Sequence, residues 1–278
     1  MSNQVSFTPY EIKDCLFDTE RTQNLKRAIC EQIKEGDVVL EAGGGTGILS
    51  MFALQCGAKH AYIIELSSRF CGRIREIAKA NGLEDRITVI CGDACVTDVP
   101  EKVDLYISEL LCTGLFFEPQ IQAYNNLRRF FKEDTKCIPM SVTSTLALAD
   151  ADTETQGVII DVDSYVASDI PHNIISTPTV YMTREFKGQY VNPKISYQGT
   201  VDMILSGVNV CNSVIITTGA KLAPSIFAGA TKFLFNPELI FLKAVGKTPI
   251  EIQHSNFTNF AIEYEAGCDT LDVELRVW

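Results

Sequence analysis

The stretch that most constrains the fold runs from Val38 to Leu54 and has the sequence VVLEAGGGTGILSMFAL. An apolar run leads into an acidic residue, then into the glycine-rich turn 43–47, and then into a segment of helical character. A strand, a tight glycine turn and a helix in this order are typical of the first βαβ unit of a nucleotide-binding fold. Glycine is needed in such a turn because the backbone approaches a ligand closely, where a Cβ atom would collide.

The spacing of the glycines excludes two familiar loops. Gly43, Gly45 and Gly47 follow a G-x-G-x-G pattern, whereas the dinucleotide fingerprint is G-x-G-x-x-G. No Lys-Ser/Thr pair follows the glycines, so the pattern is not that of a phosphate-binding P-loop. Glu41, at the end of the expected strand, is placed to meet a cation. A turn that only lets a helix pack on a sheet stays an alternative at this point.

Length and composition indicate a well-cored chain without membrane segments. Its 278 residues, 46% of them hydrophobic, suffice for one large domain or two modest ones. No apolar run approaches the roughly 20 residues that a membrane helix needs, so we expect no membrane partner. The N-terminus lacks a basic start followed by an apolar run, so we expect no secretory signal and a cytoplasmic location.

Charge and cysteine usage narrow the class of ligand. A net charge of −11 argues against nucleic acid as a partner and is compatible with cationic substrates. The ten cysteines form no C-x-x-C motif and the three histidines lie far apart, so we expect no metal site. Reduced thiols in a reducing compartment are the expected state of the cysteines.

The first half of the chain alternates between helical and strand patterns. A helical pattern from Tyr10 to Lys34, interrupted near Asp18, comes before the glycine stretch. Beyond the first strand, we expect three strands, at 61–65, 87–90 and 103–107. We also expect two helices, at 68–81 and 119–131. Strands that alternate with helices predict a parallel sheet with right-handed crossovers.

Acidic residues follow four successive expected strands: Glu41, Glu65, Asp93 and Glu109. Ligands of parallel sheets bind at the carboxyl ends of the strands, so one shared pocket explains this coincidence better than separate loops. A carboxylate at the end of the second strand can accept hydrogen bonds from both hydroxyls of a ribose. Asp93, just past the third strand, can accept from an adenine amino group.

After Pro139 the chain becomes rich in Val, Ile, Thr, Ser and Tyr, with regularly spaced turn residues. This pattern predicts an all-β unit of barrel or sandwich type. Its expected strands lie at 142–149, 157–162, 179–182, 213–218, 239–245 and 271–278. The fold class is therefore α/β, with N-terminal helices and a Rossmann-like parallel sheet in residues 1–138 and a β-rich, barrel-like acceptor domain in residues 139–278. No flexible spacer separates the two parts, so we expect them to pack rigidly.

The segment Val39–Ala53 resembles class I S-adenosylmethionine-dependent methyltransferases, and more narrowly the protein arginine methyltransferases. The first motif of that family typically reads V-L-D-V-G-x-G-T-G-I-L-S-M-F-A, and Glu41 here replaces its aspartate. The resemblance implies an enzyme with S-adenosyl-L-methionine as cofactor and S-adenosyl-L-homocysteine as product. It places cofactor contacts at Glu41, Gly43, Gly45 and Gly47.

A second point of resemblance is Ser108–Glu118, which is similar to the double-glutamate loop of that family. Glu109 and Glu118 are nine residues apart, the spacing of the family, and are implied to be the catalytic pair that grips a guanidinium. A planar guanidinium presents paired donors that two carboxylates can clamp. The alternative is that Glu118 caps the helix that begins beside Pro119.

The segment Leu16–Arg21 resembles the M-L-x-D-x-x-R segment of the family, whose arginine pairs with the methionine carboxylate of the cofactor. Arg21 inherits that role, with a solvated surface arginine as the alternative. The resemblance also implies that Glu65 binds the ribose and that Asp93 and Ala94 bind the adenine edge. The remaining cofactor contacts that we expect are Leu66 and Glu109.

The sequence departs from the family around the acceptor. Leu110–Thr113 replaces the usual W-M-G-Y, and the threonine-histidine-tryptophan loop has its closest counterpart in 224–227, without His or Trp. Residues 150–175 are short for the dimerisation arm of the family, which leaves a homodimer open. The expected reaction is in-line methylation of a guanidino group, in free arginine, a related small molecule or a protein or peptide arginine. The alternatives are a small-molecule N- or O-methyltransferase with a repurposed acceptor pocket and a non-catalytic cofactor-binding module.

Overall fold

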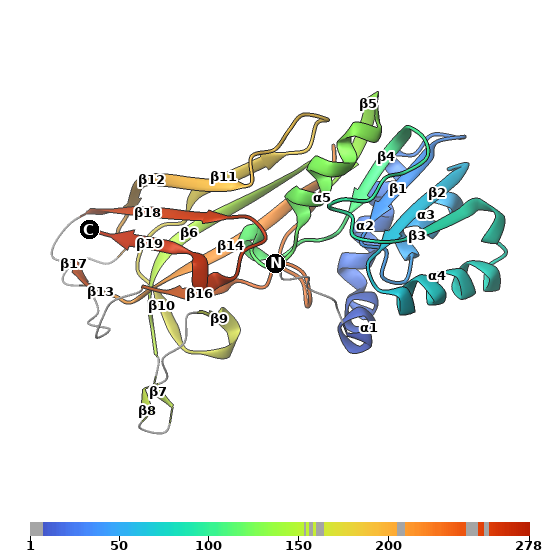
Figure 1. Cartoon of the computed structure of the whole chain (residues 1–278). Helices are drawn as coiled ribbons and strands as arrows, with labels where there is room; N and C mark the ends of the chain where they lie inside the picture. Colours follow the sequence, from blue (N-terminus) through green and yellow to red (C-terminus); the bar gives the residue numbers. More distant parts are fainter. Residues whose placement is uncertain are drawn as a thin grey trace.

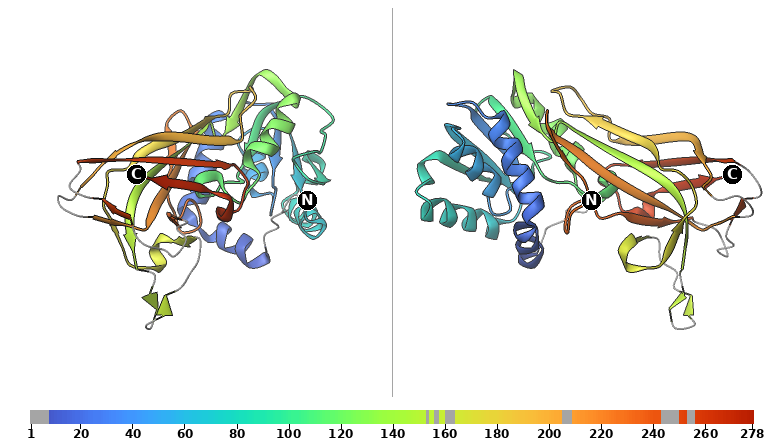
Figure 2. Two further views of the ribbon diagram at one scale, coloured as in Figure 1. Left: turned by 60° about the vertical axis from the view of Figure 1, so that its left-hand side comes forward. Right: turned by 180° about the vertical axis from the view of Figure 1, so that it is seen from behind.

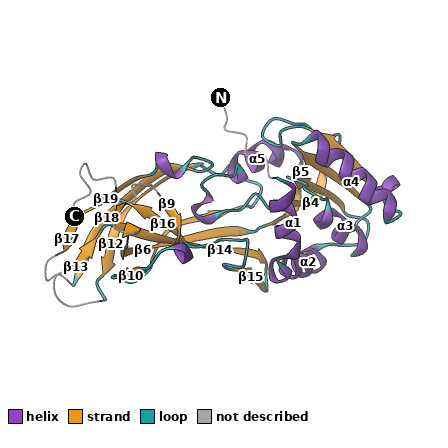
Figure 3. Ribbon diagram, turned by 90° about the horizontal axis from the view of Figure 1, so that it is seen from below, coloured by secondary structure: helices purple, strands orange, loops and turns teal. Residues whose placement is uncertain are grey.

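The computed structural model describes residues 8–152, 154–155, 158–159, 164–204, 209–242, 250–252 and 256–278. It is elongated, with a helix-flanked parallel sheet at one end and antiparallel strands at the other (Figure 1). Seen from below, the five α-helices of the described residues gather around the parallel sheet (Figure 3). This arrangement confirms the fold class expected from the sequence.

Two helices precede the sheet. Helix α1 (Pro9–Phe17) begins with a capping box in which Thr8 and Glu11 each accept from the backbone N–H of the other. Asp18 ends α1 and caps α2 (Thr19–Gln32), accepting from Arg21 N at 3.1 Å. The interruption expected near Asp18 is therefore confirmed, and it turns the chain so that Arg21 is buried.

The parallel sheet has the strand order β3-β2-β1-β4-β5. Its strands are β1 (Val38–Ala42), β2 (His60–Glu65), β3 (Ile87–Cys91), β4 (Val103–Ser108) and β5 (Phe131–Ile138). The helices between them are α3 (Ile48–Gln55), α4 (Ser68–Ala80) and α5 (Gln120–Leu127), with short 3₁₀ turns at Glu84–Arg86, Thr113–Leu115 and Arg128–Phe130. All five residues of β1 are buried, which explains its unbroken apolar pattern, because a central parallel strand is covered on both faces.

The β-rich half is built on two long antiparallel strands, β6 (Ser141–Ala151) and β14 (Ser213–Ala223). Five strands complete their sheet: β9 (Ser164–Val166), β10 (His172–Ile174), β11 (Thr179–Glu185), β15 (Ile226–Ala228) and β16 (Glu238–Phe241). A second sheet contains β12 (Lys194–Asp202), β18 (Phe257–Glu265) and β19 (Glu274–Val277). Two small pairs are β7 (Glu154–Thr155) with β8 (Val158–Ile159) and β13 (Asn209–Cys211) with β17 (Ile250–Ile252), and two 3₁₀ turns lie at Ala167–Asp169 and Thr270–Asp272.

Strand positions in this half agree with expectation only in part. Of the strand expected at 157–162, residues 158–159 are described as β8, and of that expected at 239–245, residues 243–245 lie outside the described residues. Strands β5, β12 and β18 were not expected from the sequence. In β12 buried and exposed positions alternate, so this strand lacks the long apolar run of a central one. The parallel sheet ends at Ile138 and β6 begins at Ser141, and a domain boundary at 138 stays a prediction.

Helix α2 joins the two halves. It lies between the parallel sheet and the hairpin of β14 and β15 (Figure 2). The Gln32 amide donates to the Leu222 carbonyl at 2.9 Å, and both groups are buried. Within the described residues, no helix is both long enough and apolar enough to cross a membrane.

Four of the ten cysteines are paired, so the expectation of reduced thiols is wrong for these four. Cys30 lies against Cys56 with their Cα atoms 5.3 Å apart, and Cys71 lies against Cys91 at 6.0 Å. Both pairs belong to the half that contains the parallel sheet.

Candidate active site

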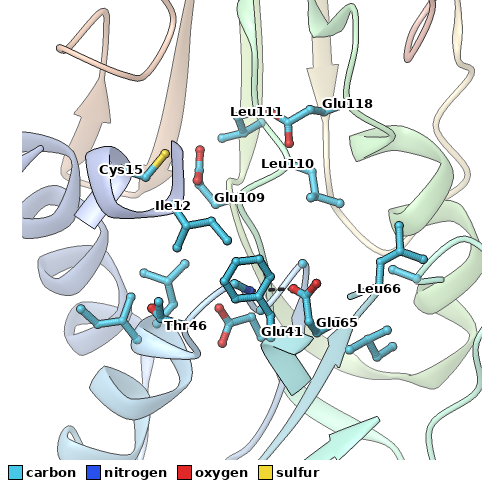
Figure 4. Close-up of a pocket in the computed structure, with 18 of the residues that line it drawn as sticks. Ile12, Cys15, Glu41, Thr46, Glu65, Leu66, Glu109, Leu110, Leu111 and Glu118 are labelled. Carbon is cyan, nitrogen blue, oxygen red and sulfur yellow. Dashed lines mark hydrogen bonds between the residues drawn. The ribbon is translucent and has the colours of Figure 1, made fainter. Parts of the chain in front are cut away.

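A pocket opens at the carboxyl ends of β1 to β4, beneath α1 and the start of α2 (Figure 4). It brings together every expected site residue except Gly47. The expected residues that line it are Arg21, Glu41, Gly43, Gly45, Glu65, Leu66, Asp93, Ala94, Glu109 and Glu118. The prediction of one pocket shared by successive strand ends therefore agrees with the geometry.

The glycines of the turn serve two different purposes. Gly43, Gly45 and Gly47 have φ angles of 77°, 54° and 76°, in the left-handed region that favours glycine. A Cβ on Gly44 would lie 2.3 Å from Ile63 Cγ2, so this glycine lets the turn pack on the sheet. At Gly45 the nearest atom to a Cβ would be Ile12 Cδ1 at 4.0 Å, so that face of the turn is open to the pocket. Gly47 caps α3 instead of lining the pocket.

Glu41 is fully buried and bound to the helix that follows the turn. Its carboxylate accepts from the Ser50 amide at 3.0 Å and also from the Ser50 hydroxyl. Burial raises the pKa of Glu41 to about 7, against the opposing effect of the two Ser50 hydrogen bonds. Glu41 thus holds the first turn of α3 in place while it lines the pocket.

Glu65 fixes the shape of the glycine turn. One carboxylate oxygen accepts from the Gly45 amide at 2.8 Å, the contact dashed in Figure 4, and the other accepts from the Ser67 amide at 2.8 Å. Leu66 follows it at the pocket wall. Beyond β3, Asp93 accepts from the Cys95 amide at 2.8 Å, which holds the Asp93–Ala94 segment against the pocket.

Arg21 is a buried residue, so the alternative of a solvated surface arginine is wrong. Its guanidinium forms an ion pair with Glu109 and donates to the Cys15 carbonyl at 3.2 Å. The side chains of Arg21 and Glu109 are only 10% and 12% exposed. Burial shields this charge-assisted pair from water, and it makes removal of either partner costly because the other charge would be left unpaired.

Glu118 lines the pocket on the same side as Glu109, as Figure 4 shows. It is 8% exposed, and burial raises its pKa to about 7, although the nearby Arg21 charge acts in the opposite direction. The N-cap of α5 is Pro119 and not Glu118, so Glu118 precedes the cap position, and its interaction with the dipole of α5 stays an alternative. A carboxyl group poised near neutrality inside a cleft is a strong candidate for proton transfer.

The loop that carries these two acids is held from the β-rich half. The Gly114 amide donates to the Thr218 hydroxyl of β14 at 2.9 Å, and the Gly114 carbonyl accepts from the Tyr264 hydroxyl of β18 at 2.7 Å. The Thr113 hydroxyl donates to the Asn236 carbonyl at 2.6 Å. The β-rich half thus sets the position of the double-glutamate loop, although none of its strands in the described part of the chain lines the pocket.

Among the described residues, the β-rich half contributes one residue to the pocket, and the sequence did not predict it. Phe233 lines the pocket, and the Phe233 amide donates to buried Asp18 at 2.9 Å, beside a second bond from the Thr231 hydroxyl. Residues 224–227, the expected counterpart of the family loop, do not line the pocket: Phe227 is exposed and Ser225 bonds to Glu31 on α2. A threonine followed two residues later by an aromatic, in Thr231-Lys232-Phe233, was the signal available in the sequence.

The residues present fit an adenosyl-sulfonium cofactor. A buried guanidinium, an acid at the end of β2 and a glycine face without a Cβ converge on one cavity. These groups suit a carboxylate, a ribose diol and close backbone contact, respectively. The apolar walls at Leu66 and Phe70 suit a purine ring.

Comparison with known proteins agrees with this geometry. Residues 39–134 match the family model described as a methyltransferase domain. An uncharacterised protein of Methanocaldococcus jannaschii is 34% identical over 266 residues, which cover 94% of each chain. The histone-arginine methyltransferase CARMER of Anopheles gambiae is 36% identical over 124 residues, 44% of this chain and only 20% of that protein.

The fold is shared with solved arginine methyltransferases. The PRMT1 enzyme–prozyme heterotetrameric complex with AdoHcy from Trypanosoma brucei superposes with a TM-score of 0.75 at 18% identity, covering 96% of each chain. The chain therefore belongs to the family of the M. jannaschii protein, within the class I S-adenosylmethionine-dependent methyltransferases that resemble the protein arginine methyltransferases. It is an enzyme with S-adenosylmethionine as its cofactor.

Proposed function

We propose that the enzyme methylates a nitrogen of a guanidino group, in free arginine, a related small molecule or an arginine side chain. The observation that carries this proposal is that Glu109 and Glu118 line the same cavity as the glycine turn. Two carboxylates can clamp the paired donors of a planar guanidinium and so orient one nitrogen towards the cofactor. The name of the Anopheles relative supports the same acceptor class.

The residues divide into a cofactor set and an acceptor set. Arg21, Glu65, Asp93 and Ala94, with the glycine turn, hold the cofactor, and Glu109 and Glu118 hold the acceptor. S-adenosylmethionine, when bound, supplies an electrophilic methyl group on a sulfonium centre. The chain contributes alignment, because it places the nucleophilic nitrogen in line with that methyl group.

Glu118 has a second task in this proposal. The guanidino nitrogen loses a proton when it gains a methyl group, and a carboxylate within reach can take up that proton. A pKa of about 7 places Glu118 close to the operating pH, where a general base works best. Glu109 stays paired with Arg21, so it serves to orient the acceptor and not to carry the proton.

A second candidate is methylation of a small amine or hydroxyl acceptor without a guanidino group. The observation in its favour is the apolar wall that Leu110, Leu111 and Phe233 form around the acceptor side of the pocket. An apolar wall of this kind suits a small acceptor of low polarity better than it suits a charged peptide.

An acceptor screen separates the two candidates. The protein is incubated with isotope-labelled S-adenosylmethionine and, in parallel, with arginine, agmatine, an arginine-containing peptide, a primary amine and a phenol. Mass spectrometry then detects a gain of one labelled methyl group. We expect methylation of at least one guanidino compound, and exclusive methylation of the amine or the phenol would favour the second candidate.

We extend the proposal to the oligomeric state and propose a homodimer. Light scattering of the same preparation tests this by measuring the molar mass in solution.

A further inference from the structure

Two cysteine pairs lie at disulfide distance in the half that contains the parallel sheet. Cys30, near the end of α2, faces Cys56 at the end of α3, and Cys71 in α4 faces Cys91 at the end of β3. Their Cα separations of 5.3 Å and 6.0 Å fall within the range of about 4.4–6.8 Å that disulfides require. The backbone therefore allows both bonds without rearrangement.

The Cys71–Cys91 pair adjoins the pocket. Cys71 follows Phe70, and Cys91 precedes the pocket segment 92–94. Cys71 Sγ lies 3.4 Å from the Glu65 carbonyl oxygen, which also accepts from the Gly92 amide at 3.0 Å. The pair thus bridges the two chain segments that flank Glu65 at the cofactor side of the pocket.

The Cys30–Cys56 pair offers an internal comparison. Cys56 is at the opposite end of α3 from Gly47, and neither Cys30 nor Cys56 lines the pocket. Their immediate neighbours in sequence also lie outside the pocket lining. A bond at this pair ties two helices together without touching the cofactor site.

We propose that Cys71 and Cys91 form a redox-active pair whose oxidation to a disulfide raises the affinity of the pocket for its cofactor. The inference rests on the proposed assignment of this side of the pocket to the cofactor. The bond ties the first turns of α4 to the end of β3, and so restricts Phe70 and the Asp93 segment before binding. Preorganised contacts lose less conformational freedom when the ligand binds, and binding is tighter for that reason.

The surroundings of Cys91 suit thiol–disulfide exchange. Cys91 is exposed, whereas Cys71 is completely buried. The Arg75 guanidinium lies 3.8 Å from Cys91 Sγ, and a neighbouring cation favours the thiolate, which is the attacking form. Cys91 is therefore the sulfur that meets an external oxidant first.

The exchange takes two balanced steps with a low-molecular-weight disulfide as oxidant. The Cys91 thiolate attacks one sulfur of that disulfide, forms a mixed disulfide and releases one thiolate. Cys71 then loses its proton to solvent and attacks Cys91 Sγ, which releases the second thiolate. The protein loses two protons and two electrons, and the oxidant gains both and becomes two thiols.

The test compares S-adenosylhomocysteine binding to the whole protein after treatment with oxidised glutathione and after full reduction. Calorimetry should show binding that is roughly two- to tenfold tighter in the oxidised protein, as expected when about one side chain is preordered. Alkylation of the denatured protein should label six of the ten cysteines before reduction. Equal affinities in the two states, or labelling of Cys71 and Cys91 after oxidation, would overturn the inference. Absence of binding in both states would instead overturn the proposed use of the pocket.

Two matched variants separate a local effect from general stabilisation. Cys91→Ser should bind like the reduced protein whatever the redox treatment. Cys30→Ser should keep the redox response of binding, while its melting temperature under oxidising conditions falls by roughly 5–10 °C because a bond outside the site is lost. A response that survives in Cys91→Ser, or disappears in Cys30→Ser, would contradict the assignment to the Cys71–Cys91 pair.

Discussion

Arg21 of α2 is ion-paired with Glu109 at the end of β4, although 88 residues separate them in sequence. One of the two carboxylates proposed to clamp the acceptor is therefore already held by a guanidinium of the enzyme itself. The pair links the cofactor side of the pocket to the acceptor side, because Arg21 is also the residue proposed to meet the methionine carboxylate. Cofactor and acceptor binding should consequently depend on each other through this pair.

Removal of one partner of the Arg21–Glu109 pair should lower the free energy of unfolding. Arg21→Met leaves Glu109 buried without a cation, for which a loss of about 3–5 kcal/mol in the free energy of unfolding is expected. In Arg21→Met/Glu109→Gln no unpaired charge remains, so part of that loss should be recovered. Denaturant unfolding of the four proteins of this cycle should give a coupling of roughly 1–3 kcal/mol. A coupling of zero would show that the two side chains act independently.

The Asp18–Thr231 contact should position Phe233 at the pocket. Burial acts to raise the pKa of Asp18, but the hydrogen bonds from Thr231, Arg21 and Phe233 outweigh it and lower that pKa. Thr231→Val removes one of these donors at nearly constant shape, so the unfolding free energy at pH 7 should fall by about 1–3 kcal/mol. The loss should shrink in acid, because a depressed carboxyl pKa stabilises the fold only while the group is ionised.

Activity provides the second readout of this variant. Displacement of Phe233 should raise the KM for the acceptor, while the affinity for S-adenosylhomocysteine stays the same. Thr217→Val is a suitable control, because Thr217 is exposed and bonds to Thr145 at 2.7 Å, away from the pocket. An unchanged acceptor KM in Thr231→Val would contradict the role given to this contact.

Glu118 should make the unfolding free energy depend on pH in the sense opposite to Asp18, because the pKa of Glu118 is raised and that of Asp18 is lowered. Its pKa is raised from 4.5 to about 7, so the folded protein binds the proton more tightly than the unfolded chain does. The contribution of Glu118 to the unfolding free energy therefore falls as the pH rises from about 4.5 to 7. Glu118→Gln should be more stable than the wild type at pH 8, by up to about 3 kcal/mol, with a smaller gain at pH 5. Equal gains at the two pH values would exclude this titration.

Gly45 should be required for cofactor binding because it has no side chain on the face of the turn that is open to the pocket, in addition to its positive φ angle. Gly45→Ala places a methyl group in the pocket, whereas Gly82→Ala meets nothing within 4 Å of its Cβ, and both positions have positive φ (54° and 65°). Each variant should lose about 1–2 kcal/mol of stability from the left-handed conformation. Only Gly45→Ala should also weaken S-adenosylhomocysteine binding, by about tenfold or more. Similar binding by the two variants would contradict the open-face interpretation.

The sequence predicts those parts of the fold and the site that follow from local patterns, and it does not predict contacts between segments that pair only in the folded protein. The acids Glu41, Glu65, Asp93 and Glu109 converge because parallel topology brings the strand ends to one edge, a rule that needs only the order of local patterns. Phe233 reaches the same pocket through pairings within the β-rich half, which local patterns do not determine. The cysteine pairs were missed for the same reason, since facing side chains on separate elements leave no motif.

The central claim is that Glu118 acts on the acceptor and not on the cofactor. Its most direct test is to measure, for Glu118→Gln, both methyl transfer to the best guanidino acceptor and the affinity for S-adenosylhomocysteine, with Glu133→Gln at an exposed site of β5 as the control. We predict that kcat falls by about 10²–10⁴, as loss of a proton acceptor and one arm of a clamp requires, while the affinity changes less than about twofold, well under 1 kcal/mol. Turnover equal to that of the Glu133→Gln control would contradict the account.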